Sequence, residues 1–377
     1  MNYRPIYYLG IDAGNRTTVI SRRDADGLNE IITIFPSFVA PVSLEEQERF
    51  NSGLNAATPF GEGEYLLSAG EGLHYYVGKL AQRQGSKATD AKGAANRYWT
   101  DHNRVLWRTA IVASIPAEEL EHNGAYNPGA DAYEFEVRIA TGLPVSLYDL
   151  ERAEMIRQAY NGVHRFTFNK RNYIIHVLVG PVVMEGTGGL VLYGSAQTKK
   201  GVIDIGYWST EIIVMEGGRP VREGSDGDEI GVGDAADILK AEVLSAFRRE
   251  LSDDEVREIL FAQARQLELP AITAYGKTLP EDRLQTMAEN ALGSTASRLK
   301  TLISSTWSSA RGYIAADINP VTLIGGGPYY FERFVQEVVP HAKMASSPES
   351  ANARAYSLIA VGYKKWSETT LSALTAR

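Results

Sequence analysis

The sequence predicts an α/β fold in which two related α/β domains follow one another. Three observations support this prediction. The chain has 377 residues, which exceeds the roughly 150 residues of one typical domain and favours two or three domains. Predicted strands alternate with predicted helices, as they do in layered α/β domains. A strand–turn–strand pattern also occurs twice at the same internal spacing, which indicates a duplication.

The first strand–turn–strand pattern spans residues 7–20. Apolar residues predict a strand that ends at Asp12, Gly14 supplies a tight turn, and a second strand begins at Thr17. A further turn at 24–27 leads to a third strand over 31–35. These residues therefore predict an antiparallel hairpin that is extended by one more strand.

The second copy of the pattern spans residues 202–214, and its next turn contains Gly217 and Gly218. Three positions correspond between the two copies: Asp12 with Asp204, Gly14 with Gly206, and Thr18 with Thr210. Each predicted domain thus begins with a hairpin that carries an aspartate at the end of its first strand.

Further elements are predicted between the two hairpins. The pattern there favours a strand over 137–141, a helix over 146–160, and strands over 165–168 and 173–179. The segment 119–133 contains Gly and Pro at loop-like spacing, and we expect it to be an exposed insertion between core strands.

After the second hairpin the chain is predicted to be mostly helical. Asp234 is expected to cap one helix, and Ser252 with Glu255 forms a capping-box pattern for the next. An apolar periodicity over 284–303 predicts a long helix. A short strand over 321–324, a glycine triplet and a final helix that begins near Ser350 follow.

Composition excludes several classes of function. The chain carries 46 acidic and 38 basic residues, for a formal charge of −8, so direct nucleic-acid binding through phosphate neutralisation is not expected. It has no cysteine, which excludes disulfides and thiol catalysis and fits a reducing, cytoplasmic location. No run of roughly 18 apolar residues predicts a membrane span.

The two hairpins carry residues that suit a phosphorylated ligand. A carboxylate at a strand end, such as Asp12 or Asp204, can hold Mg²⁺ through water. The backbone N–H groups of a glycine-containing turn can face a phosphate without obstruction by side chains. The turn residues are Gly14, Asn15, Arg16 and Thr17 in the first copy, and Gly206, Tyr207, Trp208 and Ser209 in the second.

A single aspartate in a turn often does no more than close a hairpin, but two copies at matched spacing favour a binding role. Two such hairpins facing each other would hold the β- and γ-phosphates of a nucleoside triphosphate in a cleft between two domains. The triplet Gly325, Gly326 and Gly327 would offer a third backbone approach, to the α-phosphate, ribose or base.

Three segments resemble the motifs of a known superfamily. Residues 9–15 (Leu-Gly-Ile-Asp-Ala-Gly-Asn), 202–206 (Val-Ile-Asp-Ile-Gly) and 323–327 (Leu-Ile-Gly-Gly-Gly) are similar to the first phosphate, second phosphate and adenosine motifs of actin, heat-shock chaperones and sugar kinases. Five further segments resemble the ParM/StbA group of prokaryotic actin-like ATPases: 35–37, 77–81, 141–145, 230–234 and 351–354. The resemblance covers nearly the whole chain.

The resemblance implies an actin-like ATPase fold. Residues 1–199 with 346–377 would form one domain and 200–345 the other, with a nucleotide cleft between them. It also implies Mg²⁺-dependent hydrolysis of ATP or GTP. By the same resemblance, Asp12 and Asp204 would serve the metal, Glu185 would orient the attacking water, and Asp204 would take part in catalysis.

The resemblance further implies self-association into head-to-tail filaments. In ParM-type systems such a polymer moves plasmid copies apart through a DNA-binding adaptor protein, which suits an acidic chain that does not bind DNA itself. Plasmid or DNA segregation is therefore the expected role, and no membrane partner is expected, because the C-terminal segment 371–377 is only weakly amphipathic.

Two positions depart from the family pattern. Val19 stands where relatives commonly carry a lysine that meets the β- and γ-phosphates, and Arg16 is a candidate to replace that charge. Tyr207 and Trp208 stand where relatives carry small or polar residues. We expect this aromatic pair to pack on a neighbouring strand rather than to stack on a base.

The alternative function is that of a non-polymerising small-molecule kinase or phosphatase with the same fold. Other chemistries are poorly supported. Gly276-Lys277-Thr278 resembles the end of a phosphate-binding P-loop, but Ala271 replaces its first glycine. The six histidines show no metal-binding spacing.

Overall fold

The computed structural model describes residues 4–24, 26–52, 60–70, 72–84, 97–193, 199–217, 219–308, 314–363 and 366. Gly218 of the predicted second turn and the segment 371–377 lie outside these residues. The chain forms two compact units. Unit 1 comprises Met1–Leu143, Leu147–Met184 and Asn352–Arg377, and unit 2 comprises Pro144–Ser146 and Glu185–Ala351.

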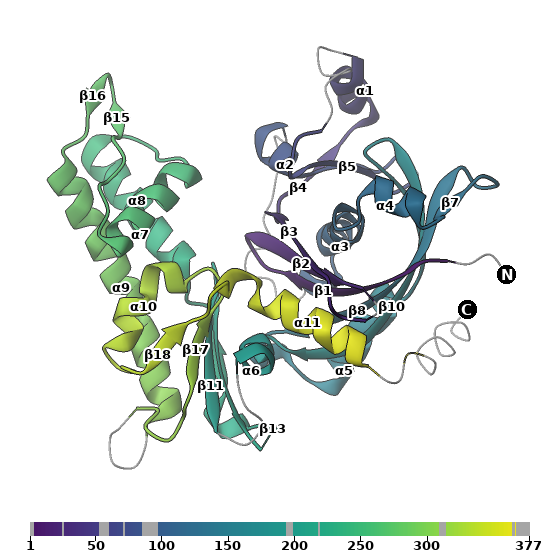
Figure 1. Cartoon of the computed structure of the whole chain (residues 1–377). Helices are drawn as coiled ribbons and strands as arrows, with labels where there is room; N and C mark the ends of the chain where they lie inside the picture. The colour runs from purple at the N-terminus through teal and green to yellow at the C-terminus, as the bar shows by residue number, and fades with distance from the viewer. Residues whose placement is uncertain are drawn as a thin grey trace. The chain divides into compact units, whose positions relative to one another are not determined.

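Unit 1 is built on one large mixed sheet (Figure 1). Its strands are β1 (Ile6–Ala13), β2 (Thr17–Arg23), β3 (Glu30–Pro36), β4 (Val39–Val42), β5 (Glu64–Ser68), β6 (His74–Gly78), β7 (Tyr126–Asn127), β8 (Ala132–Leu143), β9 (Gly162–Phe168) and β10 (Arg171–Met184). The strand order is β3-β2-β1-β8-β10-β9-β5-β6-β4, and β7 pairs with β8. The helices of this unit are α1 (Leu44–Ser52), α2 (Lys79–Gln84), α3 (Asp101–Ala113), α4 (Ala117–His122), α5 (Leu150–Tyr160) and α11 (Ala351–Gly362).

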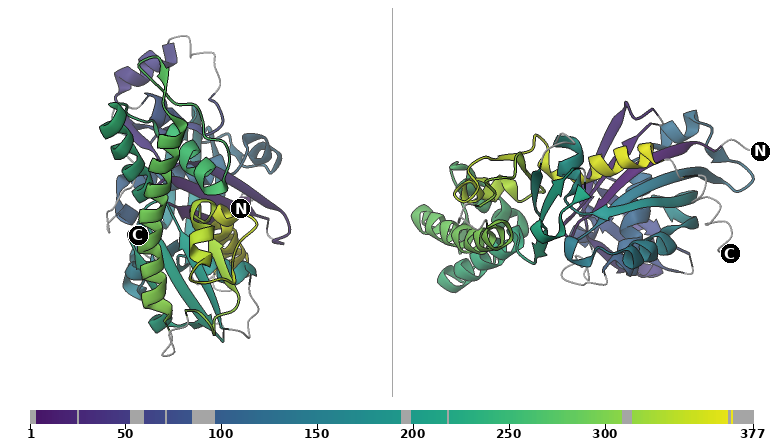
Figure 2. Two further views of the ribbon diagram at one scale, coloured as in Figure 1. Left: turned by 90° about the vertical axis from the view of Figure 1, so that its left-hand side faces the viewer. Right: turned by 90° about the horizontal axis from the view of Figure 1, so that it is seen from below.

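Unit 2 contains a smaller sheet with strand order β13-β12-β11-β17-β18, and β14 pairs with β12. Its strands are β11 (Lys200–Ile205), β12 (Thr210–Glu216), β13 (Arg219–Pro220), β14 (Asp226–Asp228), β17 (Val321–Ile324) and β18 (Ala342–Met344), with a separate hairpin of β15 (Thr273–Ala274) and β16 (Lys277–Thr278). The helices are α6 (Thr187–Tyr193), α7 (Val232–Phe247), α8 (Asp253–Arg265), α9 (Glu281–Trp307) and α10 (Pro328–Gln336). Helices α7–α10 pack into one core with the sheet, and α9 is the long helix in Figure 2, left.

The two sheets share a five-strand plan, which confirms the predicted duplication. In unit 1, β2 runs antiparallel to both of its neighbours, β3 and β1, while β1, β8 and β10 run parallel. In unit 2, β12 runs antiparallel to both β13 and β11, while β11, β17 and β18 run parallel. The hairpin and the parallel strand beside it therefore have the same order and the same directions in both units.

Helices cover both faces of the unit 1 sheet. Side chains of α3 and α5 share one buried core with Leu9 and Ile11 of β1, while Tyr356 and Ala360 of α11 pack on the opposite face (Figure 2, right). Gly10 permits the second contact, because a Cβ at this position would lie 2.0 Å from the backbone oxygen of Ala353. The glycine lets α11 lie directly on the strand that leads to Asp12.

Two sequence-based expectations need correction. The segment 119–133 is exposed at 121–124 and 128–131, as expected, but it is also anchored to the core, because Leu120 of α4 is fully buried and Glu119 forms an ion pair with the buried side chain of Arg22. Asp234 is not the N-cap of α7. Gly231 takes that position, and its N–H donates to Asp234 Oδ2 at 2.8 Å.

Other predicted local features are confirmed. Ser252 and Glu255 form the expected capping box of α8. The P-loop-like triplet that begins at Gly276 lies at the turn and second strand of the β15–β16 hairpin, so it does not open a helix.

No helix in the described part of the chain combines the length and apolar character needed to cross a membrane.

The packing of α11 on β1 predicts a strong effect at Gly10. Gly10→Ala should lower the free energy of unfolding by about 1–3 kcal/mol or more, because the added methyl group would meet rigid backbone. Gly362→Ala is the matched control, since nothing lies within 4 Å of its Cβ position at the other end of α11. Urea unfolding followed by circular dichroism would measure both. Equal stability of the two variants would contradict the described packing.

Candidate functional site

The first predicted phosphate turn connects β1 to β2. Asp12 lies opposite Val19 in this ladder, and Gly14 closes the turn so tightly that a Cβ would lie 2.7 Å from the backbone oxygen of Thr17. The guanidinium carbon of Arg16 lies 4.7 Å from the centre of the Phe38 ring. Asn15 and Arg16 therefore form the tip of a turn that needs glycine at its start.

The position opposite Asp12 carries an apolar side chain. Directly opposite residues in an antiparallel pair point to the same face, so Val19 and Asp12 share one face of the hairpin. Val19 is buried, with 4% of its surface exposed. No charge is supplied at the position where the family resemblance implies a lysine.

The second predicted phosphate turn connects β11 to β12 with the same register. Asp204 lies opposite Glu211, seven residues further along the chain, just as Asp12 lies opposite Val19. The Gly206 N–H donates to the Ser209 carbonyl at 2.8 Å, which closes the turn. Asp204 is buried, with 8% of its surface exposed.

The glycine triplet lies against this second hairpin. Because β17 runs parallel to β11, with Ile324 opposite Asp204, the chain leaves β17 beside the aspartate. Gly325 has φ +85°, and a Cβ there would lie 2.6 Å from Asp204 Oδ1. The Gly327 N–H donates to the Ile205 carbonyl at 2.7 Å. Gly326 has no neighbour within 4 Å of its Cβ position, so this loop is open at its middle residue.

The segment that contains Glu185 also packs on the second hairpin. Gly186 has φ +85°, and a Cβ there would lie 2.6 Å from Ile213 Cδ1 and 3.8 Å from Asp204 Cβ. Glycine is thus required both by the backbone and by the close contact. Glu185 is half-buried and precedes α6. Unit 2 therefore brings together the Glu185 turn, Asp204 and the glycine triplet.

The aromatic pair packs on a helix rather than on a neighbouring strand, which corrects that expectation. The Trp208 ring lies 2.4 Å from the position that a Cβ of Gly233 would occupy, and the Gly233 N–H donates to the Tyr207 carbonyl at 2.6 Å. The Tyr207 and Trp208 rings meet edge to face with centres 4.9 Å apart. These contacts fix the turn to the beginning of α7.

Glu211 is a buried acidic residue of the second hairpin that the sequence did not single out. Its side chain is buried, with 4% exposed, and its Oε2 accepts a hydrogen bond from the Val145 N–H at 3.0 Å. A Cβ at Gly227 would lie 2.1 Å from the same oxygen. The carboxylate of Glu211 thus lies over Gly227, whereas that of Asp204 lies beside Gly325. Nothing in the sequence signalled this placement, because Glu211 is one acidic residue among many.

A tyrosine lies just after the glycine triplet. The Tyr329 hydroxyl donates to Glu349 Oε2 at 2.8 Å, and burial together with this carboxylate raises the pKa of Tyr329 to about 12. The phenol is therefore protonated at neutral pH, and its hydrogen bond holds Glu349 close to the loop. In the same place, the Gly325 N–H donates to the Pro348 carbonyl at 2.8 Å.

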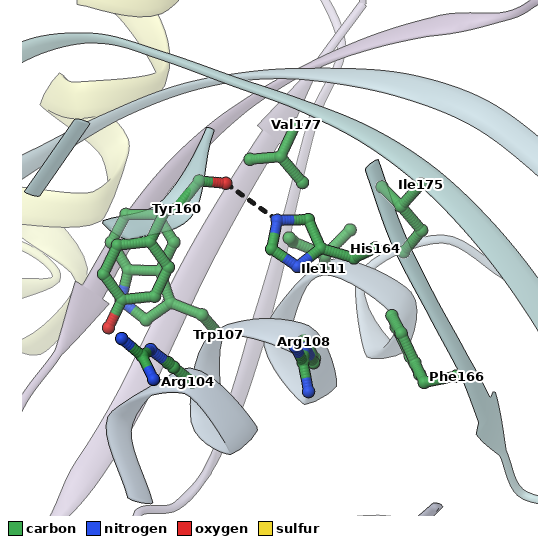
Figure 3. A pocket seen from close by; sticks show the side chains of 9 residues that line it. All are labelled: Arg104, Trp107, Arg108, Ile111, Tyr160, His164, Phe166, Ile175 and Val177. Carbon is green, nitrogen blue, oxygen red and sulfur yellow. Dashed lines mark hydrogen bonds between the residues drawn. The ribbon is translucent and has the colours of Figure 1, made fainter. Parts of the chain in front are cut away.

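A separate small cavity lies in unit 1 (Figure 3). It has room for about one water molecule. Its walls include Trp107 and Ile111 of α3 and Val177 of β10, and none of the predicted site residues lines it. Burial lowers the pKa of His164, whose Nε2 lies 2.8 Å from the Tyr160 carbonyl. We interpret this cavity as a gap in the packing rather than a ligand site.

Comparison with known proteins agrees with this fold. Residues 10–188 match the family model described as actin like proteins N terminal domain. Residues 10–188 therefore form an actin-like N-terminal domain. No curated protein matches this chain in sequence.

Solved structures of actin-like proteins share this fold over nearly the whole length of the chain. The chain is similar to an archaeal actin homolog, Ta0583, with a TM-score of 0.69 and 19% identity over 95% of this chain and 100% of that one. A 15-stranded ParM filament from Clostridium botulinum matches with a TM-score of 0.64 and 19% identity over 96% of this chain and 100% of that one. The apo psk41 ParM protein matches with a TM-score of 0.62 and 15% identity over 97% of this chain and 99% of that one.

The glycine triplet predicts opposite outcomes at adjacent positions. Gly327→Ala should destabilise unit 2 by about 1–3 kcal/mol, because its Cβ would lie 2.1 Å from Ile205 Cγ2. Gly326→Ala should leave the stability unchanged, since its Cβ position is open. Thermal unfolding of both variants would check this. A stable Gly327→Ala protein would show that the loop does not pack on β11 as described.

Proposed function

We propose that this actin-like protein binds a nucleoside triphosphate with Mg²⁺, hydrolyses it, and assembles into head-to-tail filaments. The observation that carries the proposal is the repeated hairpin. Both units place an aspartate at the end of the first strand, a glycine two residues later, and the same strand register around them. Two matched turns whose tip residues are partly exposed suit one ligand that carries several phosphates.

The residues of each turn take distinct roles in this proposal. The backbone at Gly14–Thr17 and at Gly206–Ser209 would bind the phosphates, and the loop at 325–327 would bind the nucleoside, where its open middle residue leaves room for close approach. Glu185, which the Gly186 turn holds beside the Asp204 hairpin, would orient the attacking water. In phosphoryl transfer the protein mainly positions groups and stabilises charge.

Magnesium fits the chemistry of this site. Carboxylate oxygens are the ligands that Mg²⁺ prefers, and the ion usually keeps several waters and binds substrate phosphates as well. Gly325 leaves space beside Asp204 Oδ1 that any other residue would fill. Asp204 and Asp12 would therefore hold the ion, which would neutralise phosphate charge when bound. Either ATP or GTP meets these requirements.

Filament formation is proposed because similar structures form filaments and because the fold suits it. A ParM of the same fold is described as a filament, and the archaeal actin homolog is described in complex with ADP. Head-to-tail contacts between unlike surfaces of one protomer produce open polymers. Bound nucleotide can bias such contacts by favouring one conformation over another.

A role in plasmid or DNA segregation is the cellular function that we propose. The chain carries a net charge of −8, so it would reach DNA through a DNA-binding adaptor protein rather than directly. The absence of cysteine fits a reducing compartment, and we propose the cytoplasm.

Two substitutions should separate binding from hydrolysis. Asp12→Ala should weaken the binding of Mg²⁺–nucleotide itself. Glu185→Ala should instead slow phosphate release by roughly 100-fold or more, and it should leave nucleotide binding and assembly intact. Calorimetric titration and a phosphate-release assay would measure the two effects. Asp254→Ala is a control, because this carboxylate is 81% exposed on α8. Parental hydrolysis in Glu185→Ala would refute the catalytic role of Glu185.

Assembly tests the proposed function as a whole. Light scattering and negative-stain microscopy with Mg²⁺ and ATP, GTP or a non-hydrolysable analogue should show filaments with the preferred nucleotide. The analogue should give filaments that do not disassemble, because hydrolysis is what weakens the contact. Transfer of phosphate to a small metabolite without assembly would instead support the kinase or phosphatase alternative.

A further inference from the structure

Strand β3 forms an exposed edge of the unit 1 sheet. It is the terminal strand in the order β3-β2-β1-β8-β10 and, among the described residues, pairs with β2 only. Three of its side chains are substantially exposed apolar groups: Ile31 at 43%, Ile32 at 38% and Ile34 at 45%. Leu28, just before the strand, is 81% exposed. An edge strand of this kind offers unpaired backbone groups and apolar side chains to another strand.

The other strands that end the sheets of units 1 and 2 are protected in the usual ways. Strand β4 is short and contains Pro41, β13 contains Pro220, and β18 has three residues with Lys343 at its centre. Short strands, proline and lysine are the common means by which proteins prevent pairing at an edge. Strand β3 has seven residues, and its only proline is the last of them. Among the strands that end these two sheets in the described chain, β3 alone lacks this protection.

The charge on β3 is neutralised within the protomer. Glu30 is the only charged residue of the strand, and its Oε1 lies 2.6 Å from Arg23 Nη2 while its Oε2 lies 3.0 Å from Arg354 Nε. The chain as a whole is acidic and would repel a second copy at most surfaces. At β3 two copies can approach without bringing unpaired like charges together.

We propose that β3 is a contact between two copies of this chain, in which the two β3 strands pair antiparallel about a two-fold axis at Thr33. The sequence Glu-Ile-Ile-Thr-Ile-Phe-Pro suits this register. Ile32 of each copy then lies opposite Ile34 of the other, Ile31 lies opposite Phe35, and Thr33 lies opposite itself. β-branched residues in opposite positions are favourable cross-strand pairs.

The contact is expected to be weak between isolated protomers. One pair of seven-residue strands buries less than the roughly 1,200–2,000 Å² of a stable interface. Repetition along a polymer would multiply it, because linked weak contacts bind with much greater avidity. The inference goes beyond the proposed function, since the contact is nucleotide-independent and joins like surfaces, whereas head-to-tail assembly joins unlike ones.

The absence of cysteine from the chain allows a clean crosslinking test. Opposite residues in an antiparallel pair have Cα atoms about 4.5–5.5 Å apart, within the range that a disulfide spans. Thr33→Cys in the full chain, without nucleotide and under mild copper oxidation, should give a covalent dimer. Leu150→Cys, at an 80% exposed site on α5, is the control for random collision. Equal crosslinking of the two variants would overturn the proposal.

A charge exchange tests the register. Ile32→Lys should weaken concentration-dependent self-association, measured by sedimentation velocity without nucleotide, roughly tenfold or more. The double variant Ile32→Lys/Ile34→Glu should recover it, because each lysine then lies opposite a glutamate of the other copy. Leu150→Lys should have no effect. A double variant that is as weak as Ile32→Lys, in protein with a parental circular dichroism spectrum, would refute the register.

The outcome of these experiments does not depend on whether the proposed nucleotide-driven function is correct. Loss of nucleotide binding or filaments would leave the nucleotide-free crosslink at Thr33 unchanged. Absence of that crosslink would leave nucleotide-driven assembly unchanged. Pairing of β3 with a strand from a different protein, without self-association of this chain, would also overturn the proposal.

Discussion

The register of the antiparallel hairpin is the constraint on which both units depend. Backbone pairing places the residue seven positions after each aspartate directly opposite it, so that the carboxylate and its partner share one face at the end of the strand. A shift by one residue would turn every side chain to the other face and bury the aspartate in the apolar core. The buried strand residues around each aspartate, such as Leu9 and Ile203, prevent this shift, since they must face the core.

Glycine then determines how closely other segments approach the aspartates. Gly10 lets α11 lie on β1, Gly325 lets the loop after β17 lie beside Asp204, and Gly186 lets the Glu185 turn lie on β12. At Gly325 and Gly186 the positive φ angle adds a backbone requirement to the steric one. Within unit 2, the segments beside Asp204 can therefore meet at one strand end because the residues at the contacts have no side chain.

The sequence was informative where local pattern determines structure. The matched spacing of Asp12 and Asp204 predicted two equivalent hairpins, and the capping-box residues at Ser252 and Glu255 predicted the start of α8. Prediction failed where a contact across the fold decided the outcome. Glu119 looked like part of a polar loop, yet it pairs with Arg22, 97 residues away. Glu211 gave no signal at all, because its burial depends on Gly227 of β14 and on Val145, 66 residues away.

We propose that both hairpins bind the same nucleotide. Amide hydrogen exchange, followed by mass spectrometry with and without Mg²⁺ and nucleotide, distinguishes the two turns, because it reports the protection of each one separately. We predict slower exchange on nucleotide addition at 12–17, at 204–209 and at 325–327 together, with one common concentration dependence. Slower exchange in only one of the two hairpins, at saturating nucleotide, would contradict the account.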